Sequence, residues 1–208
     1  MVCFRQSDLF TADILCVYLR DLKEIFRHSL VNINLDMKKN IWVFGVILGL
    51  VLCIPWLIMV NMLYTNPEFE SNDLLGYIIL LVIYSLVFFG IRNYREKELG
   101  GKISFASAFK TGALITLVAG SIYVLAWLIF YYLVVPDFME VYTQHVLYQC
   151  TSEEDLADKT KEMETFNQLY ENPLFVILIT YTEVIPIGLA VALVSALALR
   201  KNKNHDES

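Results

Sequence analysis

The residue best placed to do chemistry is a single acid inside a long apolar stretch of the chain. Glu183 lies in the segment ITYTEVIPIG, within the apolar run 173–199. Pro186 follows three residues later and lacks the backbone N–H that would bond to the carbonyl of Thr182. An acid beside a broken helix can form an ion-coupled site in a membrane carrier. It can equally make one interhelical hydrogen bond in a bundle, and the sequence leaves both readings open.

The position of Glu183 in its run predicts how deep it lies. About ten residues separate it from the start of the run and rather more from the end, so at ~1.5 Å per residue we expect it near mid-membrane. None of the apolar runs contains a Lys or Arg, and an unpaired charge at that depth would cost at least a few kcal/mol. We therefore expect a protonated carboxyl group, or one hydrogen-bonded to hydroxyl groups such as those of Tyr84, Ser85 and Tyr123.

No other pattern in the chain points to catalysis or to a cofactor. The sequence has no HExxH, GxSxG or Walker motif and no paired acids within an apolar run. Its four cysteines show no CxxC or Cys/His spacing that would indicate a metal site. Basic residues are not interleaved with aromatic ones, which argues against nucleic-acid binding. We expect a protein that is not an enzyme and that uses no cofactor, metal or nucleic acid.

The elements that position Glu183 follow from composition. Of the 208 residues 57% are hydrophobic and 18% charged, a balance that favours a membrane protein. A bilayer core needs roughly 20 apolar residues as a helix. Continuous apolar runs indicate helices, because a membrane barrel would show short alternating segments. The predicted class is an all-α polytopic membrane protein with a membrane domain at 37–201. Its four predicted transmembrane helices are 41–64, 74–91, 112–135 and 173–199.

Basic residues predict the orientation of these helices. Lys38 and Lys39 precede the first run, five basic residues lie between the second and third, and three follow the fourth. The loop 65–73 has no basic residue, and the long loop 136–172 has two. Lys and Arg collect on the cytoplasmic side of a membrane. Both termini, including the tail 202–208, are therefore expected in the cytoplasm.

The long loop 136–172 is expected to form a helical hairpin outside the cytoplasm. Phe138, Tyr142 and His145 recur at helical spacing in its first part. Its second part opens with Ser152 and places Asp155 three residues later, as in a capping box. We predict two short amphipathic helices between the third and fourth transmembrane helices.

The cytoplasmic loop with the sequence ELGGKISFASAFKTG has its own turn chemistry. Two adjacent glycines let the chain reverse, and Ser104 can cap the helix that follows. Two phenylalanines four residues apart would lie on one face of that helix at the headgroup level. A charged hinge explains the loop, and a binding loop for anionic lipid or a partner is the more specific reading. The loop motif comprises Gly100, Gly101, Phe105, Phe109, Lys110 and Gly112.

Small residues at helical spacing predict close packing between helices. A GxxxG pair lies in the first run, and a stripe with a four-residue period lies in the last. Such residues let helix backbones approach closely, within one chain or between chains. The last stripe lies opposite Glu183 on a helical wheel, which predicts two buried faces for that helix. The small residues are Gly45, Gly49, Gly188, Ala192 and Ala196.

Residues 1–36 form an extension before the membrane domain. They lack the pattern of a signal peptide. Leucines and other apolar residues on one face, with charges opposite, would suit an interfacial helix. The alternative is that Met37, followed by two lysines, is the true first residue. The sequence leaves both readings open.

The assembled pattern resembles an uncharacterised family of four-span bacterial membrane proteins, common in Bacteroidota and labelled as a domain of unknown function. The resemblance rests on YREKELGGKISFASAFKTG, PDFME and EVIPIGLAVALVSALALRK and covers about 37–201. It implies an inner-membrane location and no known activity. The expected function is a non-enzymatic packing or interaction module in the lipid bilayer, with a second copy or another membrane protein as partner. A small carrier or proton-linked permeability protein that uses Glu183 is the alternative.

Overall fold

The computed structural model describes residues 7–66, 69 and 73–200, with side chains described from residue 36 onward. The chain divides into two units, Met1–Lys39 and Asn40–Ser208. In the first unit the described backbone is helical. We expected an extension 1–36 that is either an interfacial helix or a segment before the true first residue. Its side chains up to residue 35 lie outside the described residues. The expected tail 202–208 does so too.

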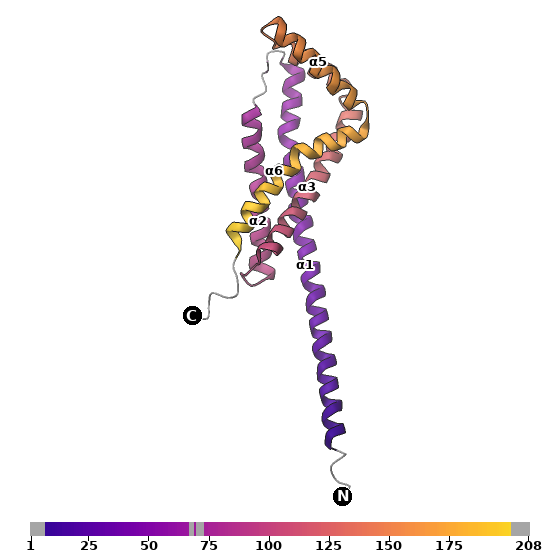
Figure 1. Ribbon diagram of the computed structural model, residues 1–208, viewed down its shortest axis with the longest axis vertical. Coiled ribbons are helices and arrows are strands. Elements are labelled where there is room, and N and C mark those ends of the chain that lie inside the picture. The colour runs from indigo at the N-terminus through magenta and orange to yellow at the C-terminus, as the bar shows by residue number, and fades with distance from the viewer. Residues whose placement is uncertain (1–6, 67–68, 70–72, 201–208) are drawn as a thin grey trace. The chain divides into compact units, whose positions relative to one another are not determined.

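The regular secondary structure in the described part of the chain is all helix (Figure 1). It contains no strand, and four of its helices include a segment long and apolar enough to cross a membrane. The predicted all-α class, with four helices long and apolar enough to cross a membrane, is thereby confirmed for the described residues. The helices are α1 (Ser7–Thr65), α2 (Asp73–Glu98), α3 (Phe105–Leu133), α4 (Phe138–Tyr148), α5 (Glu153–Tyr170) and α6 (Pro173–Leu199). The apolar segments are Asp36–Thr65, Leu74–Glu98, Phe105–Leu133 and Pro173–Leu199.

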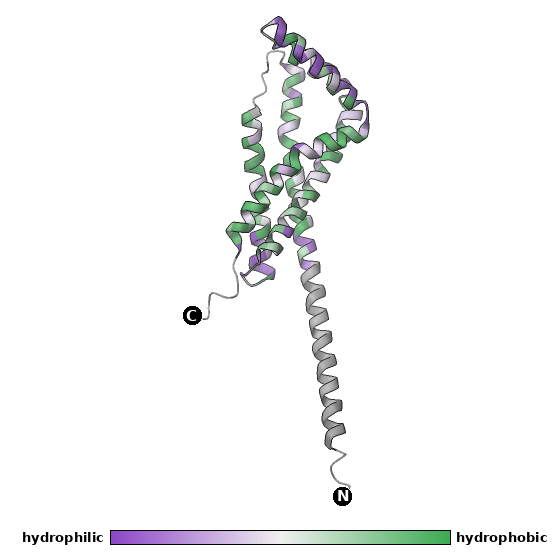
Figure 2. Cartoon of the chain, in the orientation of Figure 1, coloured by the Kyte–Doolittle hydropathy of each residue, from purple (hydrophilic) through white to green (hydrophobic). Residues whose placement is uncertain are grey.

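The helices extend beyond the apolar runs at one end of the bundle. The second helix continues past residue 91 to Glu98, and the third begins at Phe105 rather than at 112. Helical hydrogen bonding does not stop where hydrophobicity stops, so charged turns extend a helix into the headgroup region. Figure 2 shows the change from apolar to polar residues along α2. The start of α3 is fixed by Ser104, whose hydroxyl accepts a hydrogen bond from the amide of Ser107 at 3.3 Å.

The core of the second unit lies along α3, which packs against α6 and α2. A Cβ atom on Gly112 would lie 2.9 Å from the Cβ of Ala192, so α3 and α6 are in close contact there. α1 also packs against α3. A Cβ on Gly45 would lie 2.6 Å from Cγ1 of Val118. Small residues thus bring three helices together without bulky side chains between them.

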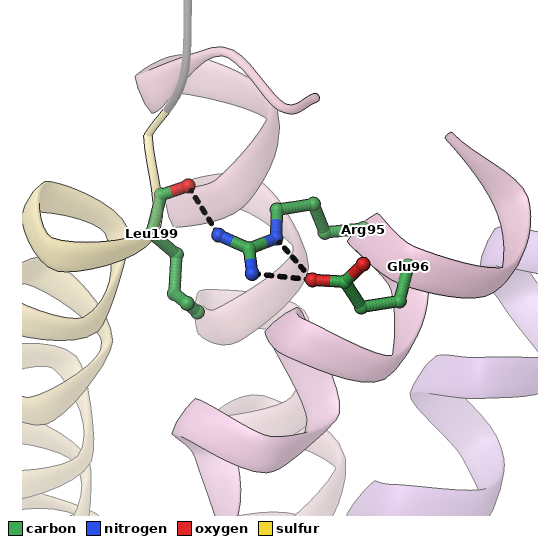
Figure 3. A network of polar contacts seen from close by, with 3 residues as sticks. All are labelled: Arg95, Glu96 and Leu199. Carbon is green, nitrogen blue, oxygen red and sulfur yellow. Dashed lines mark hydrogen bonds and ion pairs between the residues drawn. The ribbon is translucent and has the colours of Figure 1, made fainter. Parts of the chain in front are cut away.

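Polar contacts fasten the helices at the end of the bundle that carries the charged α2–α3 turn. Asn40 donates from Nδ2 to the carbonyl of Gly90 at 3.0 Å, and Asn93 donates to Asn40 Oδ1 at 2.7 Å. Arg95 donates from Nη1 to the carbonyl of Leu199 at 3.1 Å, at the last residue of α6 (Figure 3). These bonds join α1 to α2 and α2 to α6.

Two short helices occupy the segment between α3 and α6. α4 and α5 contact each other, and Asn167 donates to the hydroxyl of Thr143 at 3.3 Å. Ser152 caps α5 by accepting from the amide of Asp155 at 3.1 Å. The end of α4 contacts the α1–α2 connection. Gln149, which follows α4, donates to the carbonyl of Phe69 at 3.0 Å. The helix bounds agree with the two amphipathic segments expected from the sequence.

Candidate functional site

Glu183 lies inside the last membrane-crossing helix, ten residues after Pro173. Its depth relative to α3 is fixed two residues away, where the hydroxyl groups of Tyr181 and Ser121 are hydrogen-bonded at 2.9 Å. The Glu183 side chain is exposed on the surface of the bundle. At that depth an exposed surface meets lipid, a partner or a water-filled recess. Among the described residues none forms a hydrogen bond or an ion pair with this carboxyl group, so the group is either protonated or paired from elsewhere.

The carboxyl group interacts at longer range with three tyrosines from three other helices. Tyr84 of α2, Tyr123 of α3 and Tyr170 of α5 all interact with it electrostatically. All three side chains are buried. We call Glu183, Tyr84, Tyr123 and Tyr170 the Glu183 site.

Two buried hydroxyl groups lack hydrogen bonds where α2, α3 and α6 meet at Gly188. Tyr84 and Thr116 are both 0% exposed, and neither hydroxyl has a partner among the described residues. Both side chains press against Gly188, where a Cβ would lie 2.5 Å from Tyr84 Cε1 and 2.4 Å from Thr116 Cγ2. A buried polar group left unpaired costs roughly 1–3 kcal/mol. Native proteins keep few such groups, and they call for an explanation in function or in bound water or ion.

The structure differs from the hydrogen bonds expected around Glu183. Ser85 donates to the carbonyl of Val82 at 2.6 Å, and Thr182 donates to that of Ile179 at 2.8 Å. Neither Tyr84 nor Tyr123 donates to Glu183 in the described part of the chain. The small-residue face of α6 is buried, but the face of Glu183 is exposed. The expectation of two buried faces on this helix is therefore wrong for the single chain.

Tyr170 lies outside the membrane-crossing helices and interacts electrostatically with Glu183. Tyr170, the last residue of α5, is buried, and its ring lies 5.6 Å from that of Tyr131. Burial raises the pKa of the Tyr170 phenol, and the Glu183 carboxylate raises it further. Tyr170 therefore stays neutral throughout the physiological range. It contributes an O–H group and an aromatic ring to the site.

Other residues singled out from the sequence take structural positions. Gly188, Ala192 and Ala196 are all buried along α6. A Cβ on Gly49 would lie 2.8 Å from the Cβ of Ile122 in α3. Pro186 is exposed and lies within an unbroken helical segment. The small residues therefore pack within the bundle, whereas Pro186 lies three residues after Glu183 in the same helix.

The loop motif forms the turn between α2 and α3. Gly100 and Gly101 have φ values of 60° and 85°, which only glycine adopts without strain. The rings of Phe105 and Phe109 stack with centroids 6.1 Å apart on the first turns of α3. Lys110 is exposed, whereas Gly112 faces α2 and α6. The motif thus contributes a turn, an aromatic pair and a packing contact.

Sequence reasoning missed an apolar groove between α1 and α2. Its volume is about 350 Å³, and its lining residues are Val51, Ile54, Pro55, Ile58, Ile79 and Ile83. Every one of these side chains lies in a continuous apolar run. Hydrophobicity is uniform there, so only the spacing of the helices in space reveals the groove. Among the lining residues, Pro55 is the one that interrupts the regular helical pattern, because it lies inside α1 and lacks a backbone N–H.

The arrangement defines a class of protein: a multi-pass helical membrane protein with one carboxyl group inside a membrane-crossing helix. Residues 43–201 match the family described as Protein of unknown function (DUF4199), and the chain belongs to this family. No curated protein and no solved structure matches the chain. The family description gives no activity, so function has to be argued from the site itself.

Proposed function

We propose that this protein is a non-enzymatic interaction module of a bacterial inner membrane and that it assembles with a second copy of itself. The observation that carries the proposal is the uneven packing of α2. None of the residues 74–83 is buried, whereas Tyr84, Val87 and Ile91, in the other half of α2, are 0% exposed. Half of a membrane-crossing helix is therefore only loosely packed within one chain.

The groove beside this half-helix suits a second copy as its occupant. Its lining is aliphatic, and the unpacked half of α2 presents Leu74, Ile78, Leu81 and Val82. In a two-fold dimer each copy can place its α2 beside the groove of the other, so one patch serves as both surfaces. Packing between apolar helices and release of lipid favour such an association.

The proposed orientation places both termini and the α2–α3 turn in the cytoplasm. The support is the distribution of Lys and Arg, which collect in the turn after α2 and after α6. The same distribution puts α4 and α5 on the outer side. Their mutual contact supports an extracytoplasmic helical hairpin.

Disulfide cross-linking tests the proposed dimer. In a cysteine-free background, Val82→Cys on α2 and Val194→Cys on α6 give a matched pair, because both positions are 66% exposed. We expect oxidation in native membranes to cross-link the Val82→Cys protein to a dimer and to leave the Val194→Cys protein monomeric. Equal cross-linking at both positions, or none at Val82→Cys, would contradict the proposal.

A second candidate function is a small carrier or proton-linked permeability protein. The observation that favours it is the exposed side chain of Glu183, an acid inside an apolar helix. A carboxyl group that can take and release a proton inside the membrane is a known device of carriers. The test compares wild type with Glu183→Gln in liposomes. Identical flux of protons and small solutes in the two proteins would remove this candidate.

A further inference from the structure

We propose that the end of the bundle where α2 turns into α3 binds anionic phospholipid. Exposed basic side chains contact the phosphate headgroups, and an aromatic pair contacts the apolar part of the lipid beside them. The surface consists of Arg92, Lys97 and Lys110 with Phe105 and Phe109, and we call it the basic patch. It is separate from the proposed dimer surface, because none of these residues lines the groove between α1 and α2.

The ends of α2 and α3 place the basic patch in one layer. A Cβ on Gly112 would lie 2.8 Å from Cδ1 of Ile91, so the end of one apolar run lies beside the start of the next. At ~1.5 Å per residue, the helical stretches 92–98 and 105–111 each extend about 10 Å beyond that level. The headgroup layer is roughly 5–8 Å thick on each side of the hydrocarbon core. The basic patch therefore lies at the depth of the lipid phosphates.

The basic patch carries positive charge that the chain leaves exposed. The segment 92–110 has five basic residues and two acidic ones. One of the acids, Glu96, pairs with Arg95, whose guanidinium also bonds to the end of α6 (Figure 3). All three cations of the patch are exposed, and none of them forms an ion pair within the part of the chain that the structure describes. Lys and Arg at this depth attract anionic lipid.

The aromatic pair selects a lipid over a soluble phosphate. The rings of Phe105 and Phe109 are stacked with an interplanar angle of 6°, and Phe105 is 36% exposed. Aromatic side chains next to basic ones are typical of protein surfaces that lie at the boundary between headgroups and acyl chains. A soluble phosphate has no apolar part to cover an exposed ring, whereas a phospholipid joins a phosphate to acyl chains in one molecule.

The opposite end of the bundle has the opposite charge. The segment 136–172 has nine acidic residues and two lysines, Lys159 and Lys161. Anionic headgroups are repelled there, so the α2–α3 end is the favourable one for anionic lipid. The two lysines of the acidic segment also provide a control, because their removal changes the net charge without touching the basic patch.

Electron paramagnetic resonance of spin-labelled lipids tests the proposal on the full chain in phosphatidylcholine vesicles. The spectra give the association constant of phosphatidylglycerol relative to that of phosphatidylcholine. We expect at least a twofold preference for phosphatidylglycerol, which falls as salt screens the headgroup charge. The double variant Lys97→Gln/Lys110→Gln should bring this preference close to one. The matched control, Lys159→Gln/Lys161→Gln, removes the same charge at the acidic end and should leave the preference unchanged.

Two results would overturn the proposal. One is equal association of the two lipids with wild type, and the other is an equal loss of preference in the two double variants. Glycerol 3-phosphate at the concentration of the labelled lipid should leave the preference intact, and a reduction would mean that the surface binds soluble phosphate instead.

Cross-linking of Val82→Cys in the Lys97→Gln/Lys110→Gln background keeps this test apart from that of the dimer. Where wild type forms dimers, they should persist in this background while the lipid preference is lost. Loss of both together would show that the substitutions act through assembly or folding, and it would contradict a direct contact between the basic patch and lipid.

Discussion

At the level of single residues, Gly188 sets how closely α6 approaches α2 and α3. A methyl group there would lie within 2.6 Å of both Thr116 and Tyr84, and neither buried side chain has room to move. We expect Gly188→Ala to lower the free energy of unfolding by about 1–3 kcal/mol, since overpacking forces side chains out of their rotamers. Unfolding in mixed micelles with increasing SDS measures the change.

Gly76 provides the control for this substitution. It lies in the unpacked half of α2, and a Cβ there would meet nothing within 4 Å. Gly76→Ala should leave stability unchanged or raise it slightly, because alanine favours the helix over the unfolded chain. Equal losses from the two substitutions would contradict the packing described for α6.

Cys150, between α4 and α5, should react slowly with maleimides. Burial and the Asp155 carboxylate raise the pKa of its thiol. A raised pKa means that less thiolate is present at pH 8, and the thiolate is the reactive form. Asp155→Asn should lower the pKa and increase the labelling rate severalfold. Asp158→Asn, at an exposed neighbouring acid, should change the rate much less.

A labelling rate that is the same in wild type and Asp155→Asn would contradict this electrostatic account. The backbone amide of residue 155 still bonds to Ser152 in the variant, so the start of α5 is retained. The comparison therefore changes only the side chain of residue 155, whose charge and hydrogen bond both raise the pKa of Cys150. Both proteins should be labelled with the other three cysteines replaced.

At the level of elements, the end of α6 depends on a side chain from α2. Arg95 donates to the carbonyl of Leu199, one of the last carbonyls of α6 that lack a helical partner (Figure 3). Arg95→Gln should remove this bond and let the last turn of α6 open more often. Hydrogen exchange at residues 197–200 should then become faster, while exchange near Glu183 stays unchanged.

Lys97→Gln is the matched control for the Arg95 variant. Lys97 is an exposed basic residue of the same helical turn region, so its loss changes the net charge equally without removing the contact to α6. Faster exchange in both variants would mean that charge, rather than the hydrogen bond to Leu199, holds the end of the helix.

At the level of the whole molecule, the sequence predicts the helices well because the signals for each helix lie in its own residues. Apolar runs of sufficient length mark the four membrane-crossing segments, and Ser104 and Ser152 mark two helix starts by capping chemistry. The close approach at Gly112 and Gly188 also follows from a small-residue pattern. These signals depend on neighbouring residues only.

The surroundings of Glu183 were harder to predict because they depend on the separation of helices. Residues 74–91 are uniformly apolar, so the sequence does not distinguish the packed half of α2 from the unpacked half. The groove between α1 and α2 lies beside the loosely packed half. For the same reason Tyr84 was expected to donate to Glu183, whereas its hydroxyl is unpaired.

The central claim is that the chain crosses a membrane four times and places the α2–α3 turn and the α4–α5 segment on opposite sides. Labelling of single cysteines with an impermeant maleimide in intact spheroplasts tests it directly. The account predicts that Asp158→Cys is labelled from outside and that Lys102→Cys is labelled only after lysis. Labelling of Lys102→Cys in intact spheroplasts while Asp158→Cys stays protected would contradict the orientation, and labelling of both would contradict the four crossings.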